Sequence, residues 1–188
     1  MNIEKPDFAD YMNKLGEVAG VDLTTFQDMV DALQKRHDFF TENGCKLSDH
    51  GIEEFYDEPY TDSQIETIFA KAMRGQQLSA LEIRQYKHAF LKVCAEMDHA
   101  ADWTQQYHYG AIRDNNTLMY NKLGADTGFD SIGEFTTAKA MSSFLNELNM
   151  EGKLTRTILY TLNPCANEVI ATMLGNFQDG SCPGKIQF

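Results

Sequence analysis

The sequence predicts an α/β fold with about four parallel strands, and two observations lead to that prediction. Short apolar segments that favour strands alternate with longer segments whose apolar residues recur at helical spacing. This order is the pattern of parallel βαβ units. The last segment, Gly184 to Phe188, is strand-like and no helix follows it. An open sheet rarely finishes in this way, so we expect a partial (β/α)8 barrel of the TIM type.

An extra helical region is expected before the strand–helix units. Residues 1–44 carry two stretches of helical periodicity, one after Pro6-Asp7 and one from about Thr24 to Phe40, and Asn43-Gly44 ends the second. Residues 45–188 carry the alternating units. A chain of 188 residues is long enough for one well-buried domain and short for two, so we expect a single domain.

Four strands and four helices are expected in residues 45–188. The predicted strands are Cys45 to Ser48, Trp103 to Tyr107, Thr157 to Tyr160 and Lys185 to Phe188. The predicted helices are one capped by Thr61, one opened by the capping box Ser79-Ala80-Leu81-Glu82, one over about Phe135 to Leu148, and a short one over Asn167 to Leu174.

The composition excludes several function classes. The net charge is −12, and the basic residues are scattered along the chain. Nucleic acids and anionic membrane surfaces need clustered lysine or arginine, so we expect neither as a partner. No segment approaches the roughly 18 to 20 apolar residues of a membrane span. The four cysteines lack C-x-x-C spacing, and with no apolar signal-like N-terminus we expect reduced thiols in a cytoplasmic protein.

Candidate site residues follow from the rule that ligands bind at the carboxyl ends of parallel strands. Asp49 and His50 follow the first predicted strand, and His108 follows the second. A carboxylate and an imidazole together can perform general acid/base chemistry. Arg113, five residues after His108, could bind a carboxylate through two parallel hydrogen bonds. The structural alternatives are that Asp49 caps the following turn, that His50 packs, and that Arg113 lies on the surface.

Other segments carry weaker signals. The run Asp126 to Asp130 matches neither a phosphate-binding loop nor a calcium loop, and a tight turn explains it at least as well as ligand contact. His37, His88 and His99 fall on predicted helices and are expected at the surface or half-buried. The chain contains no H-x-H, H-E-x-x-H or C-x-x-C, so the sequence offers no recognisable metal site of its own.

Taken in order, several segments resemble the uronate (glucuronate) isomerase family of the amidohydrolase superfamily. The segments are Gly44 to Glu53, which includes Ser48-Asp49-His50-Gly51, then His108-Tyr109-Gly110-Ala111-Ile112-Arg113-Asp114-Asn115-Asn116-Thr117, Leu123 to Gly133, Thr157 to Pro164, Asn167-Glu168-Val169, Gly175-Asn176-Phe177-Gln178, and Gly184-Lys185-Ile186-Gln187-Phe188. Together they span nearly the whole chain.

The resemblance implies a distorted (β/α)8 barrel enzyme of glucuronate catabolism. Its reaction interconverts D-glucuronate with D-fructuronate, and D-galacturonate with D-tagaturonate. It implies a proton transfer through an enediol, with one divalent metal, usually zinc, helping to hold the substrate. Carried over to this sequence, Asp49 and His108 match catalytic positions, and Arg113 and His50 are weaker candidates for substrate binding.

Departures from the family pattern make us expect a central fragment. The family's metal-binding H-x-H and metal-binding aspartate have no counterpart here, so the metal ligands are expected outside this chain. The leading hypothesis is therefore a parent uronate isomerase, with this chain inactive alone. Unpaired parallel edges would favour association, so a homo-oligomer is one expectation. The alternative is a non-catalytic interaction module whose partner surface includes Phe26 and Met29.

Overall fold

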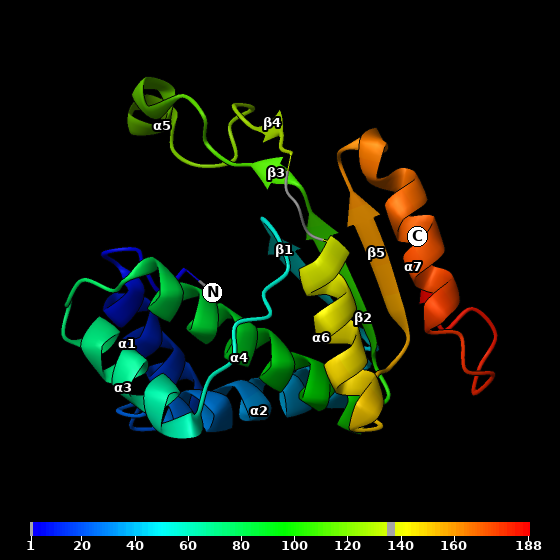
Figure 1. Ribbon diagram of the computed structural model, residues 1–188. Coiled ribbons are helices and arrows are strands. Elements are labelled where there is room, and N and C mark those ends of the chain that lie inside the picture. Colours follow the sequence, from blue (N-terminus) through cyan, green and yellow to red (C-terminus); the bar gives the residue numbers. More distant parts are fainter. Residues whose placement is uncertain (1, 135–137) are drawn as a thin grey trace.

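The computed structural model describes residues 2–134 and 138–188, and its centre is a four-stranded parallel sheet in the order β1-β2-β5-β6 (Figure 1). Its strands are β1 (Leu47–Ile52), β2 (Thr104–Tyr109), β5 (Thr157–Thr161) and β6 (Ile186–Gln187). All three pairings are parallel. The expectation of about four parallel strands in an α/β fold is confirmed.

The helices also agree with the sequence prediction in most places. They are α1 (Phe8–Ala19), α2 (Phe26–Glu42), α3 (Asp62–Met73), α4 (Ala80–Ala100), α5 (Thr117–Leu123), α6 (Ala138–Met150) and α7 (Asn167–Asn176), with a 3-10 turn at Pro164–Ala166. Helix α5 has no counterpart among the helices predicted from the sequence. The predicted start of α6 at Phe135 falls on residues 135–137, which lie outside the described residues.

Three helices begin with reciprocal side-chain caps. Thr25, Thr61 and Ser79 each accept a hydrogen bond from the backbone three residues on, and the side chain of that third residue bonds back. Each cap satisfies backbone N–H groups that the first helical turn leaves unpaired. These local signals explain why Thr61 and Ser79 predicted their helix starts correctly.

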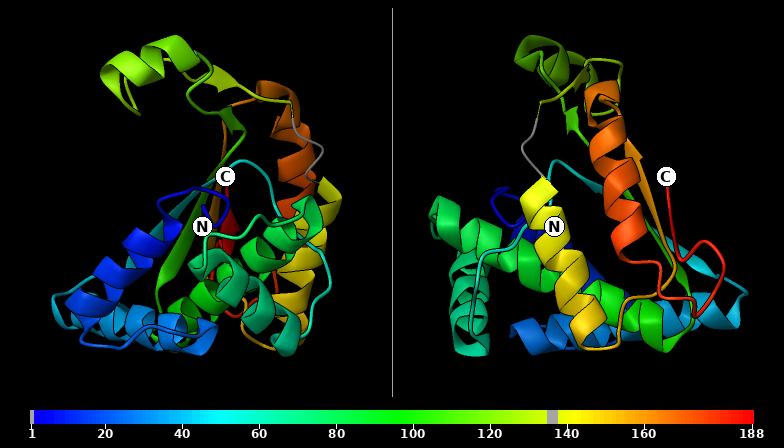
Figure 2. Two further views of the ribbon diagram at one scale, coloured as in Figure 1. Left: turned by 90° about the vertical axis from the view of Figure 1, so that its left-hand side faces the viewer. Right: turned by 45° about the vertical axis from the view of Figure 1, so that its right-hand side comes forward.

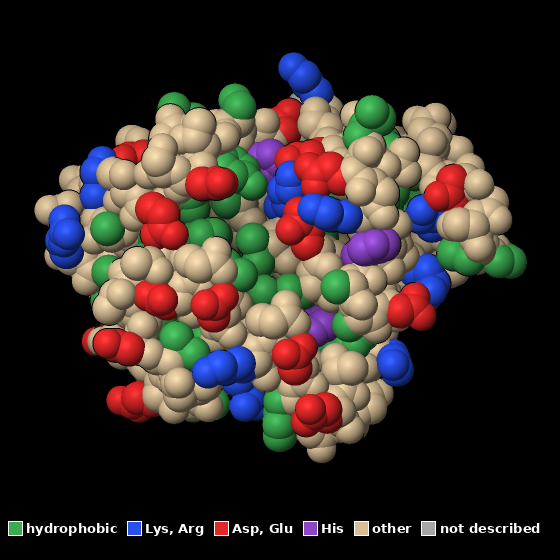
Figure 3. Space-filling view, turned by 90° about the horizontal axis from the view of Figure 1, so that it is seen from below, with side chains coloured by type: hydrophobic (Ala, Val, Ile, Leu, Met, Phe, Trp, Pro, Cys, Tyr) green, Lys and Arg blue, Asp and Glu red, His purple; other side chains and the backbone are tan. Residues whose placement is uncertain are grey.

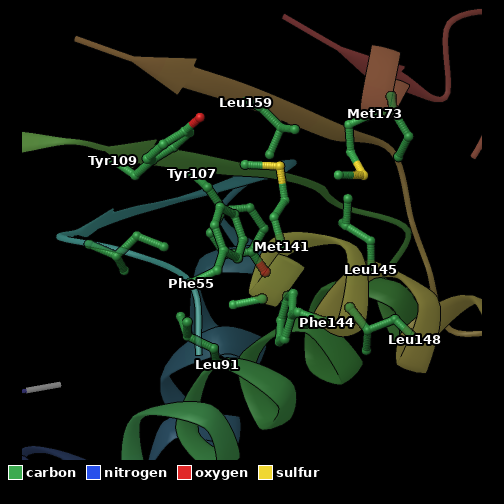
Figure 4. Close-up of a cluster of buried hydrophobic side chains, with 14 of the residues drawn as sticks. Phe55, Leu91, Tyr107, Tyr109, Met141, Phe144, Leu145, Leu148, Leu159 and Met173 are labelled. Atoms are coloured by element: carbon green, nitrogen blue, oxygen red, sulfur yellow. The ribbon is translucent and has the colours of Figure 1, made fainter. Parts of the chain in front are cut away.

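One face of the sheet carries the main core. Side chains alternate along β2 and β5, so that Tyr107, Tyr109 and Leu159 are buried while Gln106, His108, Ile158 and Tyr160 are not. Figure 4 shows these side chains packed against Met141, Phe144, Leu145 and Leu148 of α6, Leu91 of α4 and Met173 of α7.

The N-terminal helices form a second core with α3 and α4. It contains Phe8, Met12, Met29, Phe69 and Tyr86, and both Figures 1 and 2 place these helices beside the lower part of the sheet. Met29 is 0% exposed, and Phe26 packs edge-on against Phe69 and Tyr86. The interaction-module hypothesis placed these two side chains on a partner surface, but Met29 is buried within the chain and Phe26 is half-buried.

Buried polar contacts tie α2 and α4 to the first strand. Asp98 of α4 is 1% exposed and accepts hydrogen bonds from His37 Nε2 at 3.1 Å and from Ser48 Oγ at 2.5 Å.

His88, 6% exposed, bonds the carbonyl of Glu58 and the carboxylate of Glu147, each at 2.9 Å. The expectation that His88 lies at or near the surface is wrong, because its ring links α4 to α6.

The opposite face of the sheet is open. None of its residues is buried; they are Leu47, Asp49, Gly51, Thr104, Gln106, His108, Ile158, Tyr160 and Gln187. Parallel sheets are normally covered on both faces. In a closed (β/α)8 barrel the uncovered face would be the interior, where strands contribute inward-pointing side chains.

A small arm extends from the carboxyl ends of the strands. Strand β3 (Ala111–Ile112) pairs antiparallel with β4 (Ser131–Ile132), and α5 lies between them in sequence (Figure 1). No residue of α5 is buried. The segment Asp126 to Asp130 belongs to this arm, where Thr127 Oγ1 donates to the carbonyl of Gly124 at 3.0 Å.

Two surface properties bear on partners. On the face seen from below in Figure 3, lysine and arginine side chains alternate with aspartate and glutamate rather than forming a continuous stripe. Among the described residues, no helix combines the length and apolar character needed to cross a membrane.

Candidate active site

A pocket of about 540 Å³ lies at the carboxyl end of the open sheet face. Its lining comes from β1, β2 and β5 and from the chain that follows β2 and β5: Asp49, Gly51, His108, Tyr109, Ala111, Arg113, Tyr160, Thr161 and Leu162. Asp49 and His108 lie inside β1 and β2, because these strands run on to Ile52 and Tyr109. The predicted strand ends at Ser48 and Tyr107 were therefore too early.

Asp49 and His108 form the central contact of the pocket. His108 Nδ1 lies 2.5 Å from Asp49 Oδ1. In the β1–β2 register His108 lies opposite Gly51, so its ring reaches diagonally back to Asp49. An ionised carboxylate can only accept hydrogen bonds, so Nδ1 carries the proton and Nε2 is the basic nitrogen. A carboxylate-oriented imidazole of this kind can accept and return a proton.

Arg113 adds a positive charge to the same pocket. A Cβ at Gly51 would lie 3.7 Å from Arg113 Nη2, so the guanidinium lies over Gly51. Gly51 is the residue of β1 that lies opposite His108. A planar guanidinium can bind a substrate carboxylate through two parallel hydrogen bonds.

The arm holds Arg113 through Asp130. Arg113 Nη1 donates to Asp130 Oδ2 at 2.7 Å, and the backbone N–H of Asp114 donates to Asp130 Oδ1 at 2.9 Å. The hydrogen bond from the Asp114 backbone, followed by that from Arg113, lowers the pKa of Asp130. The turn role expected for Asp126 to Asp130 is thus joined by a second one, which is to orient Arg113.

His50 lies outside this group. It alternates with Asp49 along β1, so its ring points to the covered face and stacks on Tyr107 with centroids 5.5 Å apart. Burial lowers the pKa of His50, although the nearby charges of Asp98 and Asp49 oppose that shift. The structure brings Asp49, His108 and Arg113 together and does not bring His50 to the pocket.

Sequence reasoning missed three contributors: Gln106, Asp130 and Tyr160. Tyr160 stacks on His108, and its hydroxyl donates to Gln106 Oε1 at 2.8 Å. Tyr160 stands at the end of a predicted strand, which is the signal that could have selected it. Its pairing with His108 depends on the strand register, which no local pattern gives.

The described residues do not gather the ligands of a metal centre. Among residues 2–134 and 138–188, no three histidine, cysteine, aspartate or glutamate side chains gather in a way that could hold a metal ion. Asp49 and His108 supply two donors and are bonded to each other. The described residues therefore do not fit a metal centre by themselves.

Comparison with known proteins gives consistent matches. The family model described as glucuronate isomerase matches residues 1–188. A uronate isomerase of Phocaeicola vulgatus is 67% identical over 189 residues, covering 100% of this chain and 40% of that protein. One of Bacteroides thetaiotaomicron is 65% identical with the same coverage. The chain thus spans about two fifths of the length of these curated relatives.

Solved structures agree with the fold. A crystal structure of uronate isomerase from Thermotoga maritima superposes with a TM-score of 0.90 at 31% identity, covering 98% of this chain and 39% of that one. The glucuronate isomerase of Caulobacter crescentus superposes at 0.78 with 22% identity, over 88% and 34% of the two chains, and supports the fold alone. The expected partial TIM-like barrel is confirmed.

Proposed function

The chain belongs to the glucuronate isomerase family, and from that premise we propose that the complete protein interconverts hexuronate aldoses and ketoses. The substrates are D-glucuronate, converted to D-fructuronate, and D-galacturonate, converted to D-tagaturonate. The 188 residues supply part of the catalytic site and do not turn over substrate alone.

The observation that carries the proposal is the Asp49–His108 pair beside Arg113 in one pocket. An aldose–ketose shift moves a proton between C2 and C1 of the sugar, which needs a positioned base. His108 Nε2 accepts and returns the proton in that transfer, and Asp49 stabilises the imidazolium that forms. Arg113 binds the uronate carboxylate, which fixes the reacting carbons relative to His108.

A divalent metal, zinc by family resemblance, belongs to the complete site. When bound it polarises substrate oxygens as a Lewis acid. Its ligands are expected outside the described residues, since these do not gather a metal centre. His50 has no part in this proposal, because its ring lies on the covered face of the sheet.

A chimeric enzyme tests the proposal directly. The chain replaces the matching segment of the Phocaeicola vulgatus uronate isomerase, to which it is 67% identical over 189 residues. We expect the chimera to convert D-glucuronate, and His108→Gln and Asp49→Asn versions to lose at least about a hundredfold in kcat, the loss typical of a removed general base or its partner. A folded chimera without turnover would contradict the proposal.

The isolated chain provides the complementary test. With zinc added, we expect the purified 188-residue chain to show no turnover of glucuronate or galacturonate. Robust turnover would contradict the claim that it is inactive alone.

The setting of the parent enzyme is also proposed. We place it in the amidohydrolase superfamily, in glucuronate catabolism and in the cytoplasm. For the isolated chain, the open face with Leu47 at 51% exposure supports concentration-dependent self-association. Sedimentation velocity at several concentrations tests this, and a Leu47→Lys variant should sediment as a smaller species.

A further inference from the structure

Strand β5 places the ring of Tyr160 against His108. In the β2–β5 register Tyr160 lies opposite His108 on the open face. Their ring centroids are 4.2 Å apart and the planes differ by only 3°. The two rings are thus in full parallel contact, with the tyrosine on the side of His108 that faces β5.

The Tyr160 ring is itself held in place. Its hydroxyl donates to Gln106 Oε1 at 2.8 Å, and Gln106 Nε2 donates to the backbone carbonyl of Ser48 at 3.3 Å. The Tyr160–Gln106 bond runs diagonally between neighbouring strands, as the Asp49–His108 bond does. In both cases a side chain reaches the residue two positions before its opposite neighbour on the preceding strand.

The two contacts of His108 constrain different motions. The hydrogen bond to Asp49 fixes the position of Nδ1 but allows the ring to rock about that point. The stack on Tyr160 fixes the plane of the ring. Together they leave Nε2 pointing along one direction in the pocket that Arg113 also lines. His108 is 47% exposed at its side chain, so surrounding core packing does not provide this restraint.

We propose that Tyr160 is a positioning residue: it keeps the His108 imidazole in the orientation and tautomer that the Asp49 bond selects. The use of that imidazole in isomerisation rests on the proposed function, but the positioning itself does not. Tyr160 acts through His108, and its ring rather than its hydroxyl makes the contact.

The test is nitrogen-15 NMR of the histidine rings in the intact 188-residue chain. His108→Gln assigns the His108 signals by their loss. In the wild-type chain we expect the neutral ring to be protonated at Nδ1 alone, with its carbon-bound protons shifted upfield by the Tyr160 ring current. Tyr160→Phe should keep both signatures, because it retains the stacked ring. Tyr160→Leu should lose the upfield shift and show a mixture of the two tautomers.

Controls separate positioning from folding. Tyr120→Leu alters an exposed tyrosine of α5, 42% exposed, and should leave His108 unchanged. The buried His88 signals should stay in place in every variant, since they report the α4–α6 packing. A wild-type ring without the upfield shift, or a Tyr160→Leu variant with the wild-type tautomer, would overturn the inference. If Tyr160→Leu also moves His88, Tyr160→Phe and the wild-type chain still decide it through the ring-current shift.

The chimeric enzyme separates this inference from the proposed function. An inactive chimera whose His108 signals behave as expected would remove the proposed function and leave the positioning intact. In an active chimera, Tyr160→Leu should reduce kcat about tenfold with little change in KM. Tyr160→Phe should keep the kcat of the unmutated chimera. Unchanged kcat in Tyr160→Leu would overturn the positioning role.

Discussion

The guanidinium of Arg113 lies against Gly51, since a Cβ built on Gly51 would stand 3.7 Å from Nη2. That distance is an ordinary contact, so Gly51→Ala should be tolerated. Gly51→Leu would place its branched carbons where the guanidinium lies. In the chimeric enzyme we expect Gly51→Ala to keep KM for D-glucuronate within about twofold and Gly51→Leu to raise it at least about tenfold, the loss of one charged contact.

The matched pair isolates volume from backbone effects, because both substitutions remove the glycine. A Gly51→Leu enzyme with unchanged KM would mean that Arg113 does not contact the substrate. If both variants lose activity equally, the strand itself requires glycine at this position.

Buried charge makes Asp98 important for stability. It accepts hydrogen bonds from His37 and Ser48 at 1% exposure. Asp98→Asn replaces a charged acceptor by an amide, and we expect the free energy of unfolding to fall by about 2 to 3 kcal/mol. Urea denaturation followed by circular dichroism measures it.

Asp102→Asn is the matched control. The Asp102 side chain is 84% exposed and pairs with Arg156, and its backbone φ of 55° is one that asparagine also adopts readily. An exposed ion pair contributes less than about 1 kcal/mol. If Asp98→Asn and Asp102→Asn lower the free energy of unfolding equally, the buried Asp98 does not stabilise the fold more than the exposed Asp102.

The sequence predicted the site as far as the strand-end rule reaches. Asp49 and His108 were selected because carboxyl ends of parallel strands meet at one edge. The predicted first strand ends at Ser48, so the prediction placed His50 beside Asp49 in the loop after the strand. Once the strand is known to reach Ile52, alternation sends His50 to the other face.

The remaining contacts depend on tertiary structure. Tyr160 meets His108 only through the β2–β5 register, across 52 residues of sequence. Asp130 meets Arg113 through a loop whose fold depends on the β3–β4 pairing. Neither relationship has a local signal, whereas helix caps such as Ser79 do, and those were predicted correctly.

The Ser79 cap gives a simple stability prediction. Ser79 Oγ accepts from the backbone N–H of Glu82 at 3.2 Å and opens the 21-residue helix α4. Ser79→Ala should lower the free energy of unfolding by about 1 kcal/mol. Ser143→Ala, at an exposed position inside α6, should be neutral or slightly stabilising because alanine favours helix interiors. A loss at Ser143 as large as that at Ser79 would contradict the capping explanation.

Glu82 makes the same cap sensitive to pH. A hydrogen bond from Lys71, followed by bonds from the backbone and hydroxyl of Ser79, lowers the pKa of Glu82 from 4.5 to about 2. Because the folded-state pKa lies below the unfolded one, the unfolded chain binds more protons in that interval. The stabilisation by Glu82 is therefore complete above about pH 4.5 and is lost as the pH falls towards 2.

Glu82→Gln should remove this dependence. We expect it to lower the free energy of unfolding by about 1 kcal/mol at pH 7, since the pair is partly exposed, and the difference from the wild-type chain should shrink below pH 4.5. Lys71→Met removes the largest cause of the shift and should reproduce most of the effect. Urea titrations at pH 7, 5, 4 and 3 measure both variants. A Glu82→Gln deficit that stays constant over this range would show that the carboxylate acts through packing rather than charge.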